Sequence, residues 1–177
     1  STAIDTHAEL AELARIAIAI VLTAAGGTPI SATTIADLAL IGITGVSSNE
    51  LALVITAIAA TTDAGTQVDT LAELQNIIDS TLTAANVIEQ YTQGTNSTVP
   101  AEGDYALIGV TGVTSANLAA INTTIGVITA GAKDTTAEVQ QIVDLWVRIL
   151  ADANSNAADA NGHLSASELS LIGVQVG

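Results

Sequence analysis

Apolar residues follow a helical spacing along most of the chain. In residues 139–150 they stand at positions 139, 142, 143, 146, 149 and 150, which is the pattern of one helix face. Two earlier segments, 6–25 and 70–90, show a similar apolar face, and the third runs over 135–153. We call these three predicted long segments the C helices. Shorter apolar patterns lie between them, so the sequence predicts an all-α fold.

Each C helix opens with the same short motif. An Asp is followed by a Thr and, three residues later, by a Glu, which is the pattern of a capping box. In such a box the Thr hydroxyl accepts from the Glu amide and the Glu carboxylate accepts from the Thr amide. The predicted boxes are Thr6 with Glu9, Thr70 with Glu73 and Thr135 with Glu138.

A second motif lies between the long segments. It reads DLALIGITGV at 37–46, DYALIGVTGV at 104–113 and ELSLIGV at 168–174. We predict a short helix, called an A helix, in each copy. The glycines Gly42, Gly109 and Gly173 recur at a nearly constant spacing. Each follows the last Ile of a copy and precedes an apolar residue, as at a Schellman helix end.

A third type of helix, called a B helix, is predicted over 47–64 and 114–130. Ser47 and Thr114 are expected as the N-caps, because each follows a Gly-Val bend and precedes an apolar face. Val46 with Leu51, and likewise Val113 with Leu118, then has the spacing of a hydrophobic staple.

The predicted order is therefore C, A, B, C, A, B, C, A. The period is about 65 residues, and a fixed period of this kind is the signature of a repeat architecture. We expect a partial repeat at 1–27 (C only), two repeats at 28–94 and 95–162 (A, B, C), and a partial repeat at 163–177 (A only). A string of small bundles and a continuous helical solenoid both fit this order. We expect a segment cut from a longer array, or ends completed by a neighbouring molecule.

Charge limits the classes of partner. The net charge is −15, with 3 basic residues against 18 acidic ones, which argues against nucleic acids and anionic membranes. The longest apolar run, 16–22, is too short to cross a membrane. Charged residues make up 12% of the chain, so the surface must be rich in Thr, Ser and Ala, as in secreted bacterial proteins. Cysteine is absent, which excludes disulfides.

One linker resembles a metal site. Residues 157–168 have the spacing of an EF-hand calcium loop, with Asp159, Asn161, Ser165 and Glu168 at ligand positions. The first ligand position is occupied by Ala157, so a principal carboxylate is missing and any calcium binding would be weak. Ser165 with Glu168 is also a plain capping box, and this alternative stays open.

No catalytic constellation is visible. The recurring carboxylates, Glu9, Glu73 and Glu138 in one set and Asp37, Asp104 and Glu168 in the other, stand in first helical turns, where they favour the helix dipole. We therefore expect caps rather than acid–base residues, and no enzyme. Tyr105 and Trp146 are expected in the core.

Residues 104–122 and 134–144 resemble the Ala-rich helical repeats of giant secreted bacterial adhesins, including biofilm-associated and RTX-type proteins. The resemblance covers nearly the whole chain outside the linkers. It implies secretion, tandem copies and a role at the cell surface as spacer or adhesive material, and it carries over no active-site residue.

The sequence thus favours a structural, non-enzymatic module of an extracellular bacterial protein. Its expected partners are neighbouring repeats or further copies of itself, and a head-to-tail contact that does not close would give a filament. The alternative is a protein-binding helical module, calcium-stabilised or not, with a host or cell-surface partner.

Overall fold

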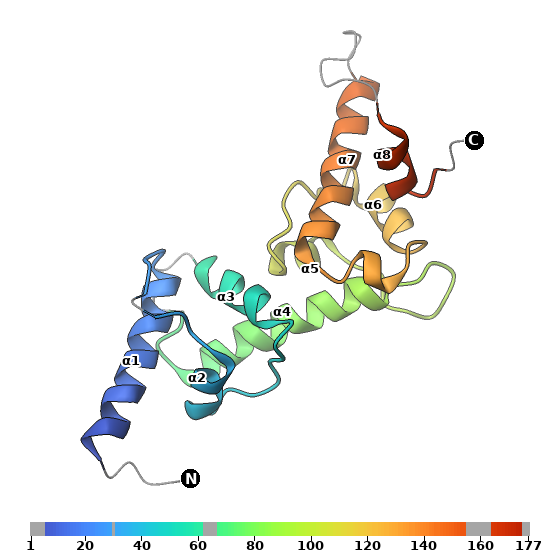
Figure 1. The fold of residues 1–177 in the computed structure, drawn as a ribbon. Coiled ribbons are helices and arrows are strands. Elements are labelled where there is room, and N and C mark those ends of the chain that lie inside the picture. Colours follow the sequence, from blue (N-terminus) through green and yellow to red (C-terminus); the bar gives the residue numbers. More distant parts are fainter. Residues whose placement is uncertain (1–5, 30, 62–66, 155–163, 175–177) are drawn as a thin grey trace. The chain divides into compact units, whose positions relative to one another are not determined.

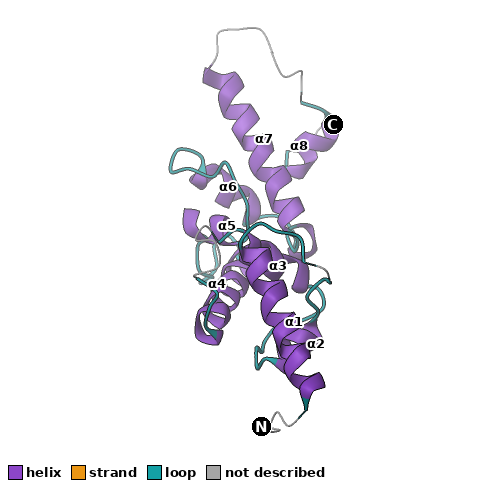
Figure 2. Ribbon diagram, turned by 90° about the vertical axis from the view of Figure 1, so that its left-hand side faces the viewer, coloured by secondary structure: helices purple, strands orange, loops and turns teal. Residues whose placement is uncertain are grey.

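The computed structural model describes residues 6–29, 31–61, 67–154 and 164–174. Every regular element in these residues is helical, which confirms the predicted all-α class (Figure 2). Figure 1 labels the α-helices, and a short 3₁₀ segment precedes α7. The bounds are α1 His7–Ala24, α2 Ile35–Leu40, α3 Leu51–Ala59, α4 Leu71–Gln90, α5 Glu102–Leu107, α6 Leu118–Ile125, η1 Ala130–Ala132, α7 Thr136–Asn154 and α8 Ala166–Leu171.

The three long helices α1, α4 and α7 begin at the predicted capping boxes. The Thr6 amide donates to the Glu9 carboxylate at 3.0 Å, and the Glu9 amide donates to the Thr6 hydroxyl at 3.2 Å. The same two bonds join Thr70 to Glu73 and Thr135 to Glu138. Two amides that lack helical partners are satisfied in each box, so the capping prediction is confirmed.

The short helices α2, α5 and α8 end at the predicted glycines. Gly42, Gly109 and Gly173 have φ values of 90°, 79° and 80°, which place them in the left-handed region. The next amide then donates back across the glycine. The bonds are Ile43 to Leu38, Val110 to Tyr105 and Val174 to Leu169, each at 2.9 Å.

The predicted start of the B helices was wrong. Helices α3 and α6 begin at Leu51 and Leu118, four residues after the expected caps, and neither has a side-chain cap. The Glu50 carboxylate accepts from the Ser47 amide at 2.8 Å, and the Glu50 amide donates to the Ser47 carbonyl. This closes a separate turn, and the first helical bond runs from Val54 to Glu50.

The predicted end of the second B helix was also wrong. Helix α6 stops at Ile125 with Gly126 as its C-cap, and η1 forms only after it. The first B helix ends at Ala59; its predicted last residues lie partly outside the described ranges.

The chain divides into two compact units, Ser1–Leu82 and Thr83–Gly177, called unit 1 and unit 2. The division falls inside α4, so α4 contributes residues to both. The hydrophobic cluster at the core of unit 1 is made of Leu, Ile, Val and Ala side chains. Its buried members are Ile16, Ile20, Ala24, Leu38, Ile43, Val54, Ile58, Val68, Leu74 and Ile78.

Unit 2 buries aliphatic residues at many corresponding positions and adds two tyrosines. Tyr105 is fully buried, as the sequence predicted. Trp146 is only partly buried, and its indole N–H donates to the Thr124 hydroxyl at 2.9 Å. The buried hydrophobic residues are Ala84, Ile88, Tyr91, Tyr105, Ile108, Val110, Ile121, Ile125, Val139, Ile142, Val143 and Leu145.

Candidate functional site

A glutamine near the start of α4 holds this helix to the bend that follows α2. The Gln75 side-chain oxygen accepts from the Thr44 amide at 3.1 Å, and its nitrogen donates to the Thr44 carbonyl at 3.2 Å. The same nitrogen donates to Asp79, one turn later, at 2.7 Å. Gln75 therefore bonds to both polar groups of one backbone position, while Asp79 orients its amide.

Unit 2 contains the same arrangement. Gln140 accepts from the Thr111 amide at 2.8 Å, donates to the Thr111 carbonyl at 3.0 Å and donates to Asp144 at 2.7 Å. We call each of these sets a Gln–bend clamp. Sequence reasoning missed them, although a signal was present, because Gln-x-x-x-Asp stands at the same place after the capping Thr in both helices.

Helix α1 lacks the clamp residues. Counted from the capping Thr, the positions of Gln75 and Asp79 are occupied in α1 by Ala11 and Arg15. Arg15 instead pairs with Glu12 and with Asp37 of α2, and it donates to the Ser31 hydroxyl at 2.9 Å. The basic side chain thus ties α1 to the helix that follows it.

Helix α1 also carries an apolar stripe that its own unit leaves exposed. Leu10 and Ile18 are 57% and 58% exposed. The residues that correspond to Leu10 are Leu74 in α4 and Val139 in α7, which are buried in unit 1 and unit 2. We call this surface the α1 outer stripe, and it consists of Leu10, Ala14, Ile18, Val21 and Leu22.

A buried polar network distinguishes unit 2. The Tyr105 hydroxyl donates to the Asn122 side-chain oxygen at 2.6 Å, and the Asn122 amide nitrogen donates to the Pro100 carbonyl at 2.8 Å. Burial raises the pKa of Tyr105, so the phenol stays neutral and remains a donor. The network joins α5, α6 and the segment before α5.

Lys133 is a further buried polar residue of unit 2, 3% exposed. Its ammonium donates to the carbonyls of Tyr91 at 2.5 Å and Ile125 at 2.7 Å. These carbonyls stand at the C-terminal ends of α4 and α6, where a cation is favourable. Burial lowers the pKa of Lys133, and the nearby negative charge of Glu89 partly opposes this effect.

The part of the predicted calcium loop that the structure describes is a helix cap. One Glu168 carboxylate oxygen accepts from the amide and the hydroxyl of Ser165, both at 2.7 Å. The other oxygen pairs with Arg148 of α7 at 2.8 Å. The bonds from Arg148 and Ser165 lower the pKa of Glu168 to about 2. The capping interpretation of this pair is therefore confirmed.

The remaining predicted metal ligands, Asp159 and Asn161, lie outside the described residues. Within the described ranges no three His, Asp or Glu side chains come together as a metal site would require. The recurring acidic residues of the short helices act as caps there too: Asp37 accepts from the Thr34 amide at 2.8 Å and Asp104 from the Ala101 amide at 2.7 Å.

Comparison of the chain with protein-family models, with curated proteins and with solved structures finds no match. Among the described helices, none combines the length and the apolar character that crossing a membrane requires.

Proposed function

We propose that the chain is a structural, non-enzymatic module of an extracellular bacterial surface protein or filament, made of tandem three-helix repeats with the period predicted from the sequence. The observation that carries this proposal is the Gln–bend clamp, which occurs twice with the same three partners, at the same place in two C helices. Recurrence of one set of contacts at equivalent positions is typical of repeat proteins. Such a module serves as spacer, adhesive or self-assembling material.

The proposed mechanism is mechanical, and α4 supports it. This helix contributes Leu74 and Ile78 to the core of unit 1, and Ala84 and Ile88 are buried in unit 2. The residues of α4 are thus divided between the two units. In the proposed array, coupling between neighbouring repeats would resist local opening.

The proposed partners are neighbouring repeats or further copies of this chain. The α1 outer stripe supports this, because Leu74 and Ile78 of α4, at the positions of Leu10 and Ala14, are buried in a core with helices α2 and α3. An A–B helix pair of the same kind would therefore cover the stripe. The net charge of −15 disfavours nucleic acid and anionic lipid as partners.

The tandem-repeat architecture can be tested by deletion. Removal of residues 28–94, one predicted repeat, joins equivalent positions of the period, so we expect a shorter chain that keeps its helical circular dichroism and unfolds cooperatively. Removal of residues 28–78 is the matched control, because it deletes less of the chain but joins positions that are out of register. If both deletions abolish cooperative unfolding, the repeat proposal is wrong.

The spacer role and the self-assembly role can be separated by the size and shape of the particles, measured by light scattering and negative-stain microscopy over a range of protein concentrations. A monomer at every concentration supports the spacer role, and fibres support self-assembly. If fibres form, Ile18→Glu in the outer stripe should prevent them. Leu71→Glu, at another exposed leucine (55% exposed), is the control and should leave them intact. Closed oligomers of fixed size would contradict both roles.

A second candidate function is a protein-binding module with a host or cell-surface partner. The exposed stripe on α1 favours it, since an exposed apolar patch marks an interaction surface. Binding of labelled protein to cells, lost with Ile18→Glu and kept with Leu71→Glu, would support it. Calcium stabilisation belongs to the same candidate: a calcium-dependent rise in Tm that disappears in Glu168→Ala would support it, and an unchanged Tm at millimolar calcium would exclude it.

A further inference from the structure

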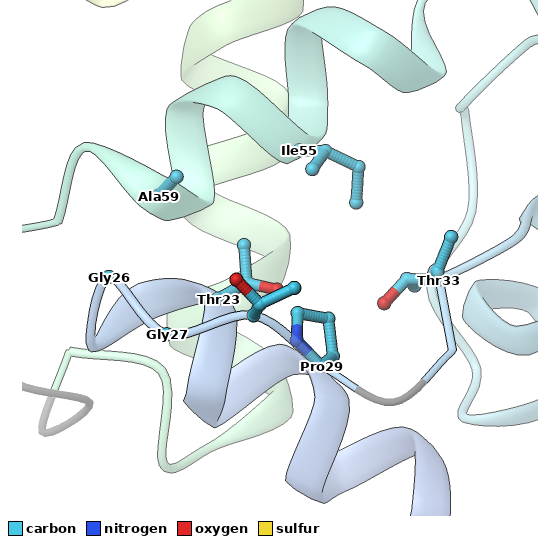
Figure 3. Close-up of a pocket in the computed structure, with 9 residues that line it drawn as sticks. Thr23, Gly26, Gly27, Pro29, Thr33, Ile55 and Ala59 are labelled. Atoms are coloured by element: carbon cyan, nitrogen blue, oxygen red, sulfur yellow. The ribbon is translucent and has the colours of Figure 1, made fainter.

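Unit 1 contains an apolar pocket of about 300 Å³ between the end of α1, the segment after it, and α3 (Figure 3). Most of its lining is apolar or backbone. Ile55 and Ala59 of α3 form one wall, and Gly27 and Pro29 of the connecting segment form another. No charged side chain belongs to the described lining, so the pocket suits a neutral occupant.

Unit 2 shows what fills the corresponding space. Counted from the capping Thr of the preceding C helix, Tyr91 stands at the position of Gly27. Counted from the glycine that ends the A helix, Gly126 stands at the position of Ala59. A Cβ built on Gly126 would come within 2.9 Å of the Tyr91 ring, so the ring, in a residue that is 9% exposed, lies directly against this glycine. In unit 2 a phenol ring thus lies beside Gly126, at the sequence positions that Gly27 and Ala59 hold in the pocket of unit 1.

The pocket also holds an unused polar group. Thr33 is 7% exposed, and its hydroxyl has no hydrogen-bond partner within the described part of the chain. Figure 3 shows its oxygen turned towards Pro29, into the pocket. Buried hydroxyls are nearly always hydrogen-bonded, so this one lacks the partner that such a group ordinarily has. The hydroxyl of Thr23, by contrast, donates to the Ala19 carbonyl at 2.8 Å.

We propose that this pocket binds a neutral, single-ring phenol, with the ring between Gly27 and Ala59 and the phenol oxygen bonded to the Thr33 hydroxyl. The size is sufficient, because an engineered apolar cavity of roughly 150 Å³ already accepts benzene. The inference is independent of the proposed structural function. A free phenolic compound and a tyrosine side chain of another protein present the same ring, and the experiment separates them.

The test is a titration of the whole chain with p-cresol, followed by backbone amide NMR. We expect saturable shifts confined to the lining residues, notably Gly26, Gly27 and Ala59. Gly27→Tyr introduces the residue of unit 2 at the edge of the pocket, with its Cβ 3.2 Å from the Leu22 carbonyl oxygen, and should abolish the shifts. Gly103→Tyr is the matched control, because Gly103 has open space around it and lies in unit 2; it should leave binding unchanged.

Thr33→Val keeps the shape of the pocket and removes the hydroxyl, which covers the case in which Gly27→Tyr does not fold. We expect it to weaken p-cresol binding about tenfold and to leave toluene binding unchanged, as a lost hydrogen bond of ordinary strength would. Absence of saturable shifts, shifts that persist in Gly27→Tyr, or an equal effect of Thr33→Val on both ligands would overturn the proposal.

A second ligand shows whether the ring belongs to a free phenolic compound or to a tyrosine side chain of a partner protein. If N-acetyltyrosinamide produces the same shifts as p-cresol, the pocket accepts a tyrosine side chain from a partner protein. If p-cresol alone produces them, it accepts a free phenolic compound. Both results support the site.

Discussion

Units 1 and 2 pack their helices with similar aliphatic residues and differ in the side chains at several corresponding positions. Both place aliphatic residues at matching positions, for example Val54 and Ile121, or Ile58 and Ile125, and both have a Gln–bend clamp. At four positions unit 1 has an apolar residue where unit 2 has a polar or aromatic one. The corresponding pairs are Leu38 and Tyr105, Ile55 and Asn122, Val68 and Lys133, and Gly27 and Tyr91.

The difference shows that the clamp and the aliphatic stripe define the unit, while the remaining volume can be filled in more than one way. Unit 2 uses a network whose members depend on one another, since each polar atom needs its partner when buried. Unit 1 has no such dependence at these positions and retains a pocket. The units should therefore respond differently to substitutions at corresponding positions.

The largest expected effect is at Asn122. Replacement by Leu leaves the Tyr105 hydroxyl and the Pro100 carbonyl buried without partners, which we expect to cost about 3 kcal/mol of unfolding free energy. Ile55→Leu at the corresponding position of unit 1 should cost less than about 1.5 kcal/mol. Urea unfolding measures both.

A double-mutant cycle sharpens this prediction. Tyr105→Phe alone should cost about 1 kcal/mol, because it removes one buried hydrogen bond. In the Asn122→Leu background it should be neutral or stabilising, since the unpaired hydroxyl is then removed. Additive effects of the two substitutions would show that the network is not coupled.

The next largest effect is expected for Lys133→Met, which should cost about 2 kcal/mol of unfolding free energy because two buried carbonyls lose their donor. The lowered pKa of Lys133 also makes the unfolding free energy depend on pH. Just below the ordinary lysine pKa, the unfolded chain binds more protons than the folded chain, so the unfolding free energy should rise with pH in this range. Chemical unfolding measured as the pH rises towards 10 should show this rise in the wild type and not in Lys133→Met.

Above about pH 10 the raised pKa of Tyr105 acts in the opposite direction, because the unfolded phenol then ionises before the folded one. Lys133 is the only lysine of the sequence, so no other lysine contributes to the pH dependence below about pH 10. A flat profile there in the wild type would contradict the assignment.

The two clamps should show the smaller, matched effects that a common contact requires. Gln75→Ala and Gln140→Ala should each cost about 1 kcal/mol, because each removes exposed hydrogen bonds to one backbone position. Ala11→Gln introduces the same residue in α1 and should change nothing. Costs in urea unfolding that differ between the two units by more than about 1 kcal/mol would break their equivalence.

Much of the local structure could be predicted because it depends on neighbouring residues. The capping box of Thr6 with Glu9 and the left-handed Gly42 each need only a few residues of sequence, and both were predicted correctly. The start of α3 was predicted three residues too early, with Ser47 as the N-cap in place of Glu50. Ser47 and Glu50 suit either a capping box or a separate turn, and tertiary packing decides between the two.

The candidate sites depended more on long-range contacts. The bond from Gln140 to Thr111 spans 29 residues and that from Lys133 to Tyr91 spans 42. Neither distance follows from helical periodicity. The recurrence of Gln and Asp at one spacing was visible in the sequence, but its partner, a backbone group in a bend, carries no side-chain signal. Once such a contact has been seen in one unit, the corresponding residues of the other unit predict the same contact there.

The smallest predicted effect concerns the end of unit 2, where Arg148 pairs with Glu168 as Arg15 pairs with Asp37 in unit 1. The pKa of Glu168 is lowered to about 2 from an ordinary value near 4.5. Its contribution to the docking of α8 is therefore complete above pH 4.5 and is lost as the pH falls towards 2. Because the two side chains of the pair are 25% and 35% exposed, the change should be local and partly reduced by salt.

Hydrogen exchange at the Val174 amide, which bonds to the Leu169 carbonyl, should report this loss at the end of α8. Glu168→Gln should remove the pH dependence, and Asp104→Asn, at the corresponding cap of α5, should not. Protection of Val174 that stays constant from pH 5 to pH 2 in the wild type would mean that the capping bonds of Ser165 and the ion pair with Arg148 do not hold α8 in place. The two units would then differ in how they fix their A helices as well as in what fills their cores.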